Sequence, residues 1–271
     1  MRRFLLLSVF SLVLAEVQAQ FTYGTTGLLN MPTADMQRDK TLMVGGGFLE
    51  KHATPARWTY DTWNYYLSLT FFPWLEMSYT CTLHKAMEND PAYGKGFWVP
   101  STYGKFVNQD RMFSARIRIW KEEWWKEWTP QVVVGLNDFA NGKWNGDEGG
   151  KIPFSSSRTN GFYNRGYIAV SKHINFQGIG NLGLHTAYVY NERKDYHLDG
   201  PCIGANFRFV QTDQSLWNKI LDGVNLMAEY DSRTVNVGAS YSLWKDRINL
   251  ITELTECKYF SGGIFFKVHL K

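Results

Sequence analysis

The sequence lacks the features that mark several common classes of protein. Beyond its N-terminal segment, no stretch contains the roughly 18 consecutive apolar residues that a membrane-spanning helix requires. Basic and acidic residues are interspersed despite a net charge of +4, so no basic stripe predicts a nucleic-acid partner. The three cysteines, Cys81, Cys202 and Cys257, lie far apart, without a C-x-x-C pair or a histidine at metal-ligand spacing, and predict no zinc site. We expect three buried free thiols, with one disulfide as the alternative.

Motifs of catalysis and ligand binding are also missing. His173, His185 and His269 have no Gly-x-Ser-x-Gly or other nucleophile spacing beside them, so we expect structural histidines rather than a hydrolase. The acidic stretch at 145–150 lacks the spaced oxygen ligands of a calcium-binding loop and predicts a solvated exterior loop. Three glycines at 45–47 lie within a predicted strand, which excludes a phosphate cradle and indicates curvature or close packing. The sequence therefore predicts no enzyme, no cofactor and no metal.

The N-terminus has the features of a secretory signal peptide. Arg2 and Arg3 precede an apolar stretch at 4–15, and the small-x-small pattern at 17–19 predicts cleavage after Ala19. The apolar stretch is too short for a comfortable membrane helix. No cysteine follows the cleavage site, so we expect an exported mature chain without a lipid anchor.

Apolar and polar residues alternate with a period of two through most of the mature chain, as they do in strands with one apolar face. In the stretch 113–120, Phe113 and Ile117 lie on one face, and Arg116 and Arg118 lie on the other. A soluble sandwich would turn the arginines to water. A membrane barrel would turn them into a wet lumen and the apolar face to lipid. This stretch alone is compatible with both folds.

The number and length of the strands separate these alternatives. Soluble strands average about 5 or 6 residues, whereas most candidates here have about 9 to 13, and their number is even. The candidates lie at 41–51, 62–72, 75–84, 110–120, 131–139, 161–173, 181–191, 201–211, 223–231, 233–244, 247–256 and 258–271. Short connections such as 72–74 alternate with long ones such as 85–109, as periplasmic turns alternate with exterior loops in outer-membrane barrels. We therefore favour a barrel with both termini in the periplasm.

Aromatic residues make up 16% of the chain and gather near the predicted strand ends, as in the interfacial belts of membrane proteins. The sequence WKEEWWKEW at 120–128 fits such a belt, with a docking site for a protein as the alternative. Trp98, Tyr103 and Phe106 lie in a long predicted loop, where they either stack on sugar rings or close the loop over the barrel mouth. The segment 215–222 predicts a short amphipathic helix at the membrane face.

Charged and polar residues on the second face of the strands are the predicted lumen lining. They are Glu76, His84, Arg116, Arg118, Arg208, Glu229 and Glu253. Because an unpaired charge in a narrow barrel is costly, we expect these residues to form ion pairs that lock the interior, or to line a polar path for a solute. About twelve strands enclose a lumen narrower than that of the large channels of about 16 to 18 strands, so a folded polymer would not pass.

Several short motifs, in the same order, resemble the YjbH-like family of outer-membrane proteins over most of the mature chain. GTTGLLNMPTADM, from Gly24, is similar to that family's Gly-x-x-Gly-Leu stretch followed by Pro-Thr-Ala. FFPWLEMSY, from Phe71, looks like its short turn before a strand, and PQVVVGLNDFANG resembles its Pro-x-x-x-x-Gly-x-Asp-x-x-Gly segment, with Asn137 intervening. AEYD with the later Asn236 looks like its Glu-Tyr-Asp hairpin. The resemblance implies an outer-membrane barrel linked to exopolysaccharide production or export, and it implies no catalytic residue.

These observations predict an all-β protein with a transmembrane antiparallel up-and-down barrel of about twelve strands. The signal peptide is expected at 1–19, an N-terminal periplasmic segment at 20–40, and the barrel at 41–271, in the outer membrane of a Gram-negative cell. We expect a non-catalytic role in export or organisation of surface polysaccharide, with a structural subunit of a larger envelope complex and a small-solute channel as alternatives. The expected partners are outer-membrane lipid, other outer-membrane or periplasmic proteins, and polysaccharide, with no nucleic acid.

Overall fold

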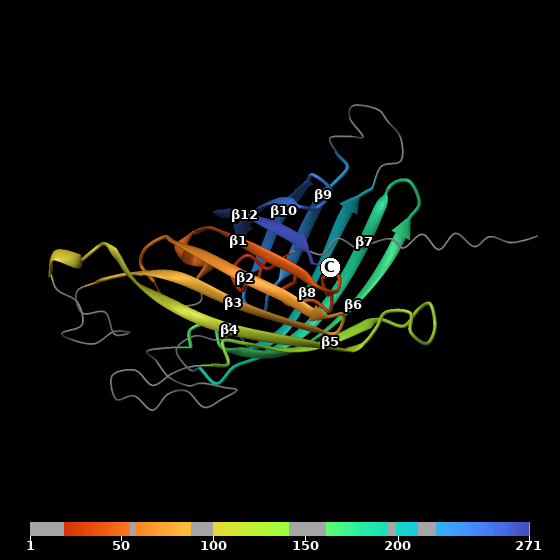
Figure 1. Cartoon of the computed structure of the whole chain (residues 1–271), viewed down its shortest axis with the longest axis horizontal. Helices are drawn as coiled ribbons and strands as arrows, with labels where there is room; N and C mark the ends of the chain where they lie inside the picture. Colours follow the sequence, from red (N-terminus) through yellow and green to blue (C-terminus); the bar gives the residue numbers. More distant parts are fainter. Residues whose placement is uncertain are drawn as a thin grey trace, which may run out of the picture.

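The computed structural model describes residues 19–54, 58–87, 100–140, 161–193, 199–210 and 221–270. Over these ranges the chain forms a closed antiparallel barrel in which each strand pairs with its neighbours in sequence and the first strand pairs with the last (Figure 1). The strands are β1 (Thr41–Leu49), β2 (Thr62–Phe72), β3 (Leu75–Lys85), β4 (Phe106–Trp120), β5 (Gln131–Asn137), β6 (Arg165–Phe176), β7 (Gly180–Tyr190), β8 (Gly200–Phe209), β9 (Val224–Tyr230), β10 (Val235–Leu243), β11 (Ile248–Thr255) and β12 (Tyr259–His269). Two short 3-10 helices, η1 (Lys51–Ala53) and η2 (Pro100–Thr102), lie in the connections. The predicted up-and-down barrel is therefore confirmed, and the sandwich is wrong.

The alternation of side chains along each strand decides which face is inside. On β4, Phe113 and Ile117 are 44% and 42% exposed on the outer surface, whereas Ser114 and Arg116 are 1% and 0% exposed inside the barrel. Successive residues of a strand point to opposite faces, so one register continues through the whole strand. The apolar register faces outward, and the arginines face the interior.

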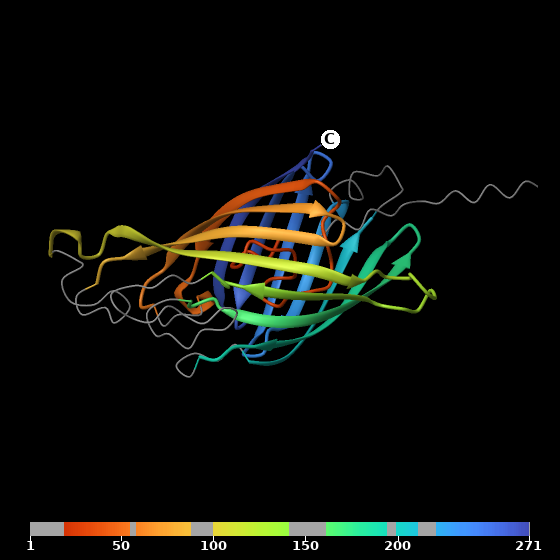
Figure 2. The ribbon, with the colours of Figure 1, turned by 60° about the horizontal axis from the view of Figure 1, so that its bottom comes forward.

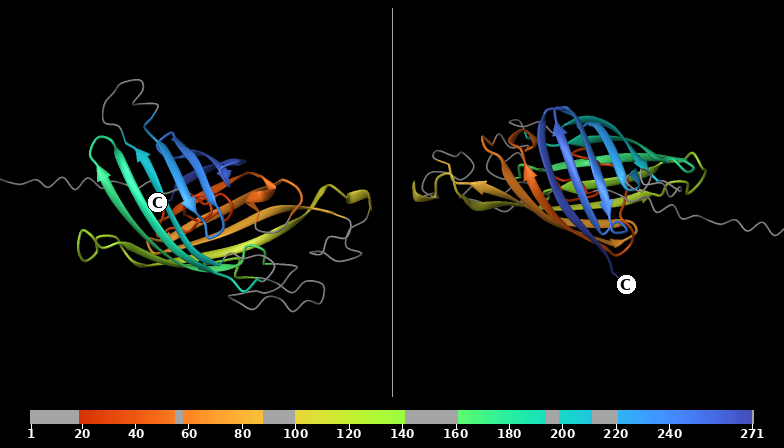
Figure 3. Two further views of the ribbon diagram at one scale, coloured as in Figure 1. Left: turned by 180° about the vertical axis from the view of Figure 1, so that it is seen from behind. Right: turned by 90° about the horizontal axis from the view of Figure 1, so that it is seen from above.

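The two ends of the barrel have different connections. At the end where β1 begins and β12 finishes, here called the terminal end, tight turns at 73–74, 177–179 and 244–247 join neighbouring strands (Figure 2). Two longer linkers, 121–130 and 210–223, lie at this same end. The opposite end, here called the loop end, has connections as long as 86–105 and 138–164, together with the short 231–234 and 256–258. Two further views show the closed wall of strands between these ends (Figure 3).

Inside the wall lies the chain's own N-terminal segment, residues 20–37, here called the plug (Figures 1 and 2). Apart from the half-buried Asp35, every residue of the plug is buried. The plug folds back on itself, with a bridge between Gly27 and Pro32, and Gly24 takes a left-handed φ of 67° in its first turn. We expected 20–40 to be a periplasmic segment; the structure instead places the plug in the barrel, because the wall presents hydrogen-bonding groups to its backbone.

Other features of the described chain bear on earlier expectations. No helix among the described residues has the length and apolar character needed to cross a membrane. All three cysteines are free, as expected, but only Cys81 and Cys202 are buried. Cys257 is exposed because it lies in the turn between β11 and β12, with a left-handed φ of 56°. The predicted signal peptide lies outside the described residues except for Ala19.

Candidate functional site: the plugged lumen

Glu229 on β9 accepts hydrogen bonds from three consecutive backbone amides of the plug. The amide N of Asn30 lies 2.7 Å from its Oε1, the amide N of Leu29 lies 3.0 Å from its Oε2, and the amide N of Met31 lies 3.2 Å from both oxygens. Asn236 on β10 donates to the same carboxyl at 3.2 Å and fixes its position. Successive N–H groups that converge on one acceptor form a backbone nest. Here the nest belongs to the plug and the acceptor belongs to the wall.

Two further wall residues bind the plug backbone: Arg116 donates to its carbonyl oxygens, and Glu76, like Glu229, accepts from an amide. Nη2 of Arg116 donates to the carbonyl oxygens of Thr33 and Asp35 at 2.6 Å each, and Nη1 donates to the carbonyl oxygen of Thr26. Oε1 of Glu76 accepts from the amide N of Thr26 at 2.7 Å. The two side chains are paired positions of β3 and β4, with Nε of Arg116 3.9 Å from Oε2 of Glu76. Both side chains are fully buried, and a buried ion pair needs additional hydrogen bonds to offset the loss of water. The plug backbone supplies such hydrogen bonds here.

Arg165, at the start of β6, is a further wall cation that contacts the plug, and it was not among the predicted lumen residues. Its Nη2 donates to the carbonyl oxygen of Asn30 at 3.0 Å, and its Nε donates to Oδ1 of Asn137 at 2.9 Å. The guanidinium lies 3.6 Å from the ring centroid of Tyr23, a cation–π contact. The alternation along β6 could have identified Arg165 as a lumen residue, because it lies on the same inward face as Tyr167 and Ser171.

Glycines of the wall make room for apolar side chains of the plug. A Cβ at Gly47 or at Gly263 would overlap the ring of Phe21, and a Cβ at Gly204 would lie 2.6 Å from Cδ1 of Leu28. These separations are too short for real Cβ contacts, so any larger residue requires movement of the plug or the wall. Of the two uses considered for the glycines at 45–47, Gly47 serves close packing.

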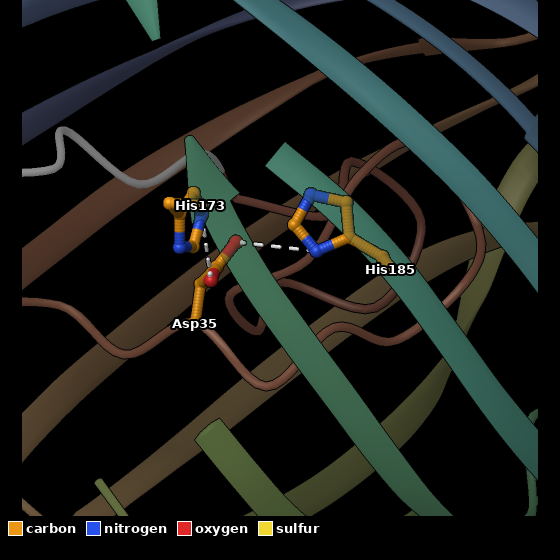
Figure 4. Close-up of side chains that lie close together, drawn as sticks. All are labelled: Asp35, His173 and His185. Atoms are coloured by element: carbon orange, nitrogen blue, oxygen red, sulfur yellow. Dashed lines mark ion pairs between the residues drawn. The ribbon is translucent and has the colours of Figure 1, made fainter. Parts of the chain in front are cut away.

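Near the terminal end, Asp35 of the plug lies between two histidines of the wall (Figure 4). Its Oδ1 is 3.4 Å from Nε2 of His173 on β6, and its Oδ2 is 3.8 Å from Nδ1 of His185 on β7. The histidines are diagonal neighbours on the hairpin, since His173 pairs with Gly183 and His185 pairs with Ser171. One N or O atom from each of the three residues lies within 4.8 Å of the others. Both histidines were expected to be structural, and nothing in the sequence indicates that they lie beside Asp35.

Residues outside this group fix both imidazoles. Oε2 of Glu122, in the linker 121–130, lies 2.7 Å from Nδ1 of His173, and its Oε1 lies 3.0 Å from Nζ of Lys172. Burial raises the pKa of the Glu122 carboxyl, but hydrogen bonds from His173 and Lys172 outweigh burial and lower the pKa to about 2. Nε2 of His185 lies 2.8 Å from Oδ1 of Asn206 on β8. Glu122 is therefore ionised, and each histidine has one nitrogen engaged away from Asp35.

Comparison with known proteins bears on the part of the chain that contains the plug. The sequence model of the family described as YjbH, "Exopolysaccharide biosynthesis protein YbjH", matches residues 19–147. The similarity is to the YjbH family. This match includes the plug and β1 to β5. The motif GTTGLLNMPTADM, which is one of those that carry the resemblance in the sequence, covers 24–36 and thus lies within the plug.

Two individual proteins were also compared. The "Uncharacterized lipoprotein YjbH" of Escherichia coli (strain K12) is 30% identical over 125 residues, which are 45% of this chain and 15% of the relative. This chain therefore corresponds to a small part of that relative's length. Among solved structures, a protein described as AttH from Nitrosomonas europaea aligns over 86% of this chain and 93% of its own at 10% identity, with a TM-score of 0.17, too low to indicate a shared fold.

Four of the seven residues predicted to line the lumen contact the plug. They are Glu76, Arg116, Glu229 and Glu253. The last of these accepts from the side-chain amide of Asn30 at 2.5 Å and from the hydroxyl of Thr255 at 2.9 Å. The YjbH-like Glu-Tyr-Asp hairpin therefore contributes its glutamate, Glu229, to plug binding.

The other three predicted residues lie elsewhere in the wall. His84 is fully buried, with its Nδ1 2.5 Å from the hydroxyl of Tyr60. Arg118 is half-buried and donates to Oε1 of Gln131 at 3.2 Å, and this glutamine in turn donates to a carbonyl oxygen of the plug. Arg208 on β8 is half-buried. These positions follow the strand register.

The predictions for the loops have mixed outcomes. Trp98, the acidic stretch 145–150 and most of 215–222 lie outside the described residues. Tyr103 and Phe106 are exposed at the loop end, where Nζ of Lys85 lies 5.0 Å from the ring centroid of Phe106. Phe106 begins β4 and is therefore part of the wall rather than of the loop.

Proposed function

We propose that this protein is an outer-membrane barrel that serves the export or organisation of exopolysaccharide as a non-catalytic component of the cell envelope. The observation that carries the proposal is a closed barrel with an apolar outer surface and an interior filled by its own plug. The match of the exopolysaccharide-related family to residues 19–147 supports the link to polysaccharide. Because the chain covers 15% of its curated relative, the role is proposed for this barrel alone.

The outer surface supports a location in lipid. Large apolar side chains are exposed along the strands, with Ile119 on β4 at 52% and Ile203 on β8 at 65% as examples. Soluble monomers rarely expose apolar patches larger than a few hundred Å². Trp74 and Trp244 lie at the terminal end and Trp63 lies at the loop end, all exposed, as expected for two interfacial belts.

The interior supports a role other than that of an enzyme or an open pore. The carboxyl groups of Glu76, Glu229 and Glu253 accept hydrogen bonds from the plug, so their polar atoms serve structure. An open path for a small solute would require the plug to leave and its backbone N–H groups to find other partners, at about 1–3 kcal/mol for each one left unpaired. The plugged state therefore favours an organising role over a channel.

A second candidate, a structural subunit of a larger envelope complex, is favoured by the linker 121–130. Trp124, Trp125 and Trp128 are each about two-thirds exposed there (67%, 66% and 65%). Tryptophan is enriched at the energetically dominant positions of protein interfaces. A partner protein at the terminal end would bury these rings, and the same linker already contacts β6 through Glu122.

Deletion of the gene, with complementation by wild-type protein, tests the proposal directly. We expect the protein in the outer-membrane fraction with heat-modifiable mobility, and a loss of surface polysaccharide on deletion that the wild-type gene restores. Unchanged polysaccharide would contradict the proposed role. Stable co-purification of partners in mild detergent, lost when the three linker tryptophans are replaced by serine, would support the subunit. Steady conductance of the wild-type protein in planar bilayers would support the channel.

A further inference from the structure

The group formed by Asp35, His173 and His185 has the spacing of a metal site. A tetrahedral Zn²⁺ site with metal–ligand bonds of about 2.0–2.1 Å places its ligand atoms roughly 3.3 Å apart. Two of the separations are 3.4 Å, from Asp35 Oδ1 to His173 Nε2, and 3.8 Å, from Asp35 Oδ2 to His185 Nδ1. One ligand atom from each of the three residues lies within 4.8 Å of the other two, so side-chain rotation would have to close the remaining distance around one cation.

The hydrogen bonds around the group leave the correct nitrogens as ligands. Glu122 accepts from Nδ1 of His173, so Nε2 is the nitrogen that faces Asp35, and a cation bound there would take the place of the Nε2 proton. Asn206 accepts from Nε2 of His185, which leaves the Nδ1 lone pair on the Asp35 side. The hydroxyl of Ser171, 2.8 Å from this Nδ1, is the group that a cation would displace.

The partners of the two histidines also match the surroundings of known zinc ligands. Metal-bound histidines almost always donate their second N–H to a carboxylate, a carbonyl or water, which fixes the ring and its tautomer. Glu122 provides a carboxylate for His173, and the Asn206 amide provides a carbonyl oxygen for His185. The three ligands come from the plug, β6 and β7, and the two supporting groups come from the linker 121–130 and β8.

One oxygen of Asp35 is unsatisfied in a way that a cation would correct. Among the described residues, Oδ1 of Asp35 is buried without a hydrogen-bond partner, although it lies within ion-pair distance of His173. Its Oδ2 accepts from the hydroxyl of Thr33 at 3.2 Å. A buried polar atom without a partner costs about 1–3 kcal/mol.

We propose that Asp35, His173 and His185 bind one divalent transition-metal cation of the Zn²⁺ class, with water as the fourth ligand. Two imidazoles and one carboxylate suit Zn²⁺, whereas Mg²⁺ and Ca²⁺ prefer all-oxygen sites. The cation joins the plug to the β6–β7 hairpin, so metal binding stabilises the plugged barrel in proportion to metal concentration. This inference is independent of the proposed role in polysaccharide.

Titration of the full chain in detergent, without a polyhistidine tag and after treatment with a chelator, tests the site. We expect one equivalent of Zn²⁺ to bind by calorimetry, Co²⁺ to give the visible absorption of a tetrahedral complex, and Zn²⁺ to raise the midpoint of the heat-modified mobility transition. Asp35→Asn and His185→Asn should each weaken Zn²⁺ binding by at least about 100-fold, and Glu122→Gln by about 10- to 100-fold.

His52→Gln is the matched control. His52 lies at the loop end, outside the proposed site, where its Nδ1 is 2.9 Å from Oε2 of Glu50. This variant should bind Zn²⁺ as the wild type does. Heat-modifiable mobility of each variant establishes that the barrel has folded. The proposal is overturned if wild type binds no stoichiometric Zn²⁺ or Co²⁺, or if folded Asp35→Asn binds both as tightly as wild type. A lower transition midpoint in Asp35→Asn, with no response of wild type to Zn²⁺, would show a metal-free ion pair instead.

Discussion

Replacing Glu229 by alanine tests whether the wall holds the plug or merely encloses it. The substitution removes the acceptor of three buried N–H groups, those of Leu29, Asn30 and Met31. Each buried N–H left without a partner costs about 1–3 kcal/mol, and water entering the space left by the side chain recovers part of that cost. We therefore expect the plugged state to lose about 3–5 kcal/mol in Glu229→Ala. Glu229→Gln keeps one acceptor oxygen but places its side-chain NH2 group against the N–H groups of the plug, and we expect a loss of about 1–3 kcal/mol.

Conductance and unfolding report on this loss in different ways. Because 1.4 kcal/mol corresponds to about a tenfold change in an equilibrium, a loss of about 3 kcal/mol raises the released fraction of the plug more than a hundredfold. In planar bilayers we expect more frequent openings in the order wild type, Glu229→Gln, Glu229→Ala. The midpoint of the heat-modified mobility transition should fall in the same order.

Glu127→Gln provides the control, since Glu127 is an exposed residue of the linker 121–130. It should match wild type in both assays. If Glu229→Ala stays as closed and as heat-resistant as wild type, the three hydrogen bonds do not retain the plug, and the reasoning from the interior is refuted. A lower midpoint without openings would mean that the remaining contacts suffice to keep the lumen closed.

Three further expectations follow from the same structure. Arg116→Ala leaves three carbonyl oxygens of the plug without their donor and should lower the free energy of unfolding in urea by about 3–5 kcal/mol, whereas Arg118→Ala, at a half-buried site with one neutral partner, should cost less than about 1 kcal/mol. Gly204→Val forces a side chain against Leu28 and should cost about 1–3 kcal/mol in the same assay, partly restored when Leu28→Ala is added. Burial raises the pKa of Asp138 well above its usual value, so the folded protein keeps a proton that the unfolded chain releases above about pH 4, and stability falls as pH rises toward the folded pKa. Asp138→Asn should therefore raise the thermal midpoint at pH 8 and leave it unchanged at pH 3; an equal effect at both values would contradict this assignment.

Period-two alternation was sufficient to predict the wall because the apolar register of the strands lies on the outer surface and the polar register lies inside. The alternation does not give the correct start of a strand where a backbone turn interrupts it. We predicted a strand at 161–173, but β6 begins at Arg165, because Gly161 takes a left-handed φ of 66° and the amide of Asn164 donates to its carbonyl oxygen at 3.1 Å in a turn. The apolar residues of this turn have the composition of a strand, and only the backbone distinguishes them.

The plug could not be predicted in the same way, because its contacts connect residues that are distant in the sequence. The amide of Leu29 and the carboxyl of Glu229 are 200 residues apart, and the amide of Thr26 and Glu76 are 50 apart. The threonines, glycines and asparagine of this segment are equally typical of an exposed linker. Strand alternation predicted that Glu76, Arg116, Glu229 and Glu253 face the interior. It could not predict that their partners would be groups of the plug in addition to one another.

The wall recognises the plug mainly through its backbone, and this determines what could open the barrel. Carboxyl groups of Glu76 and Glu229 accept from plug amides, while Arg116 and Arg165 donate to plug carbonyls. Side-chain identity matters where apolar groups meet wall glycines, as Phe21 does at Gly47, and where Asn30 and Asp35 meet polar side chains of the wall. Releasing the plug would uncover unpaired groups on both surfaces at once, with a cost that water alone repays only in part. A physiological opening would therefore need a ligand or partner that offers its own donors and acceptors to one of these surfaces.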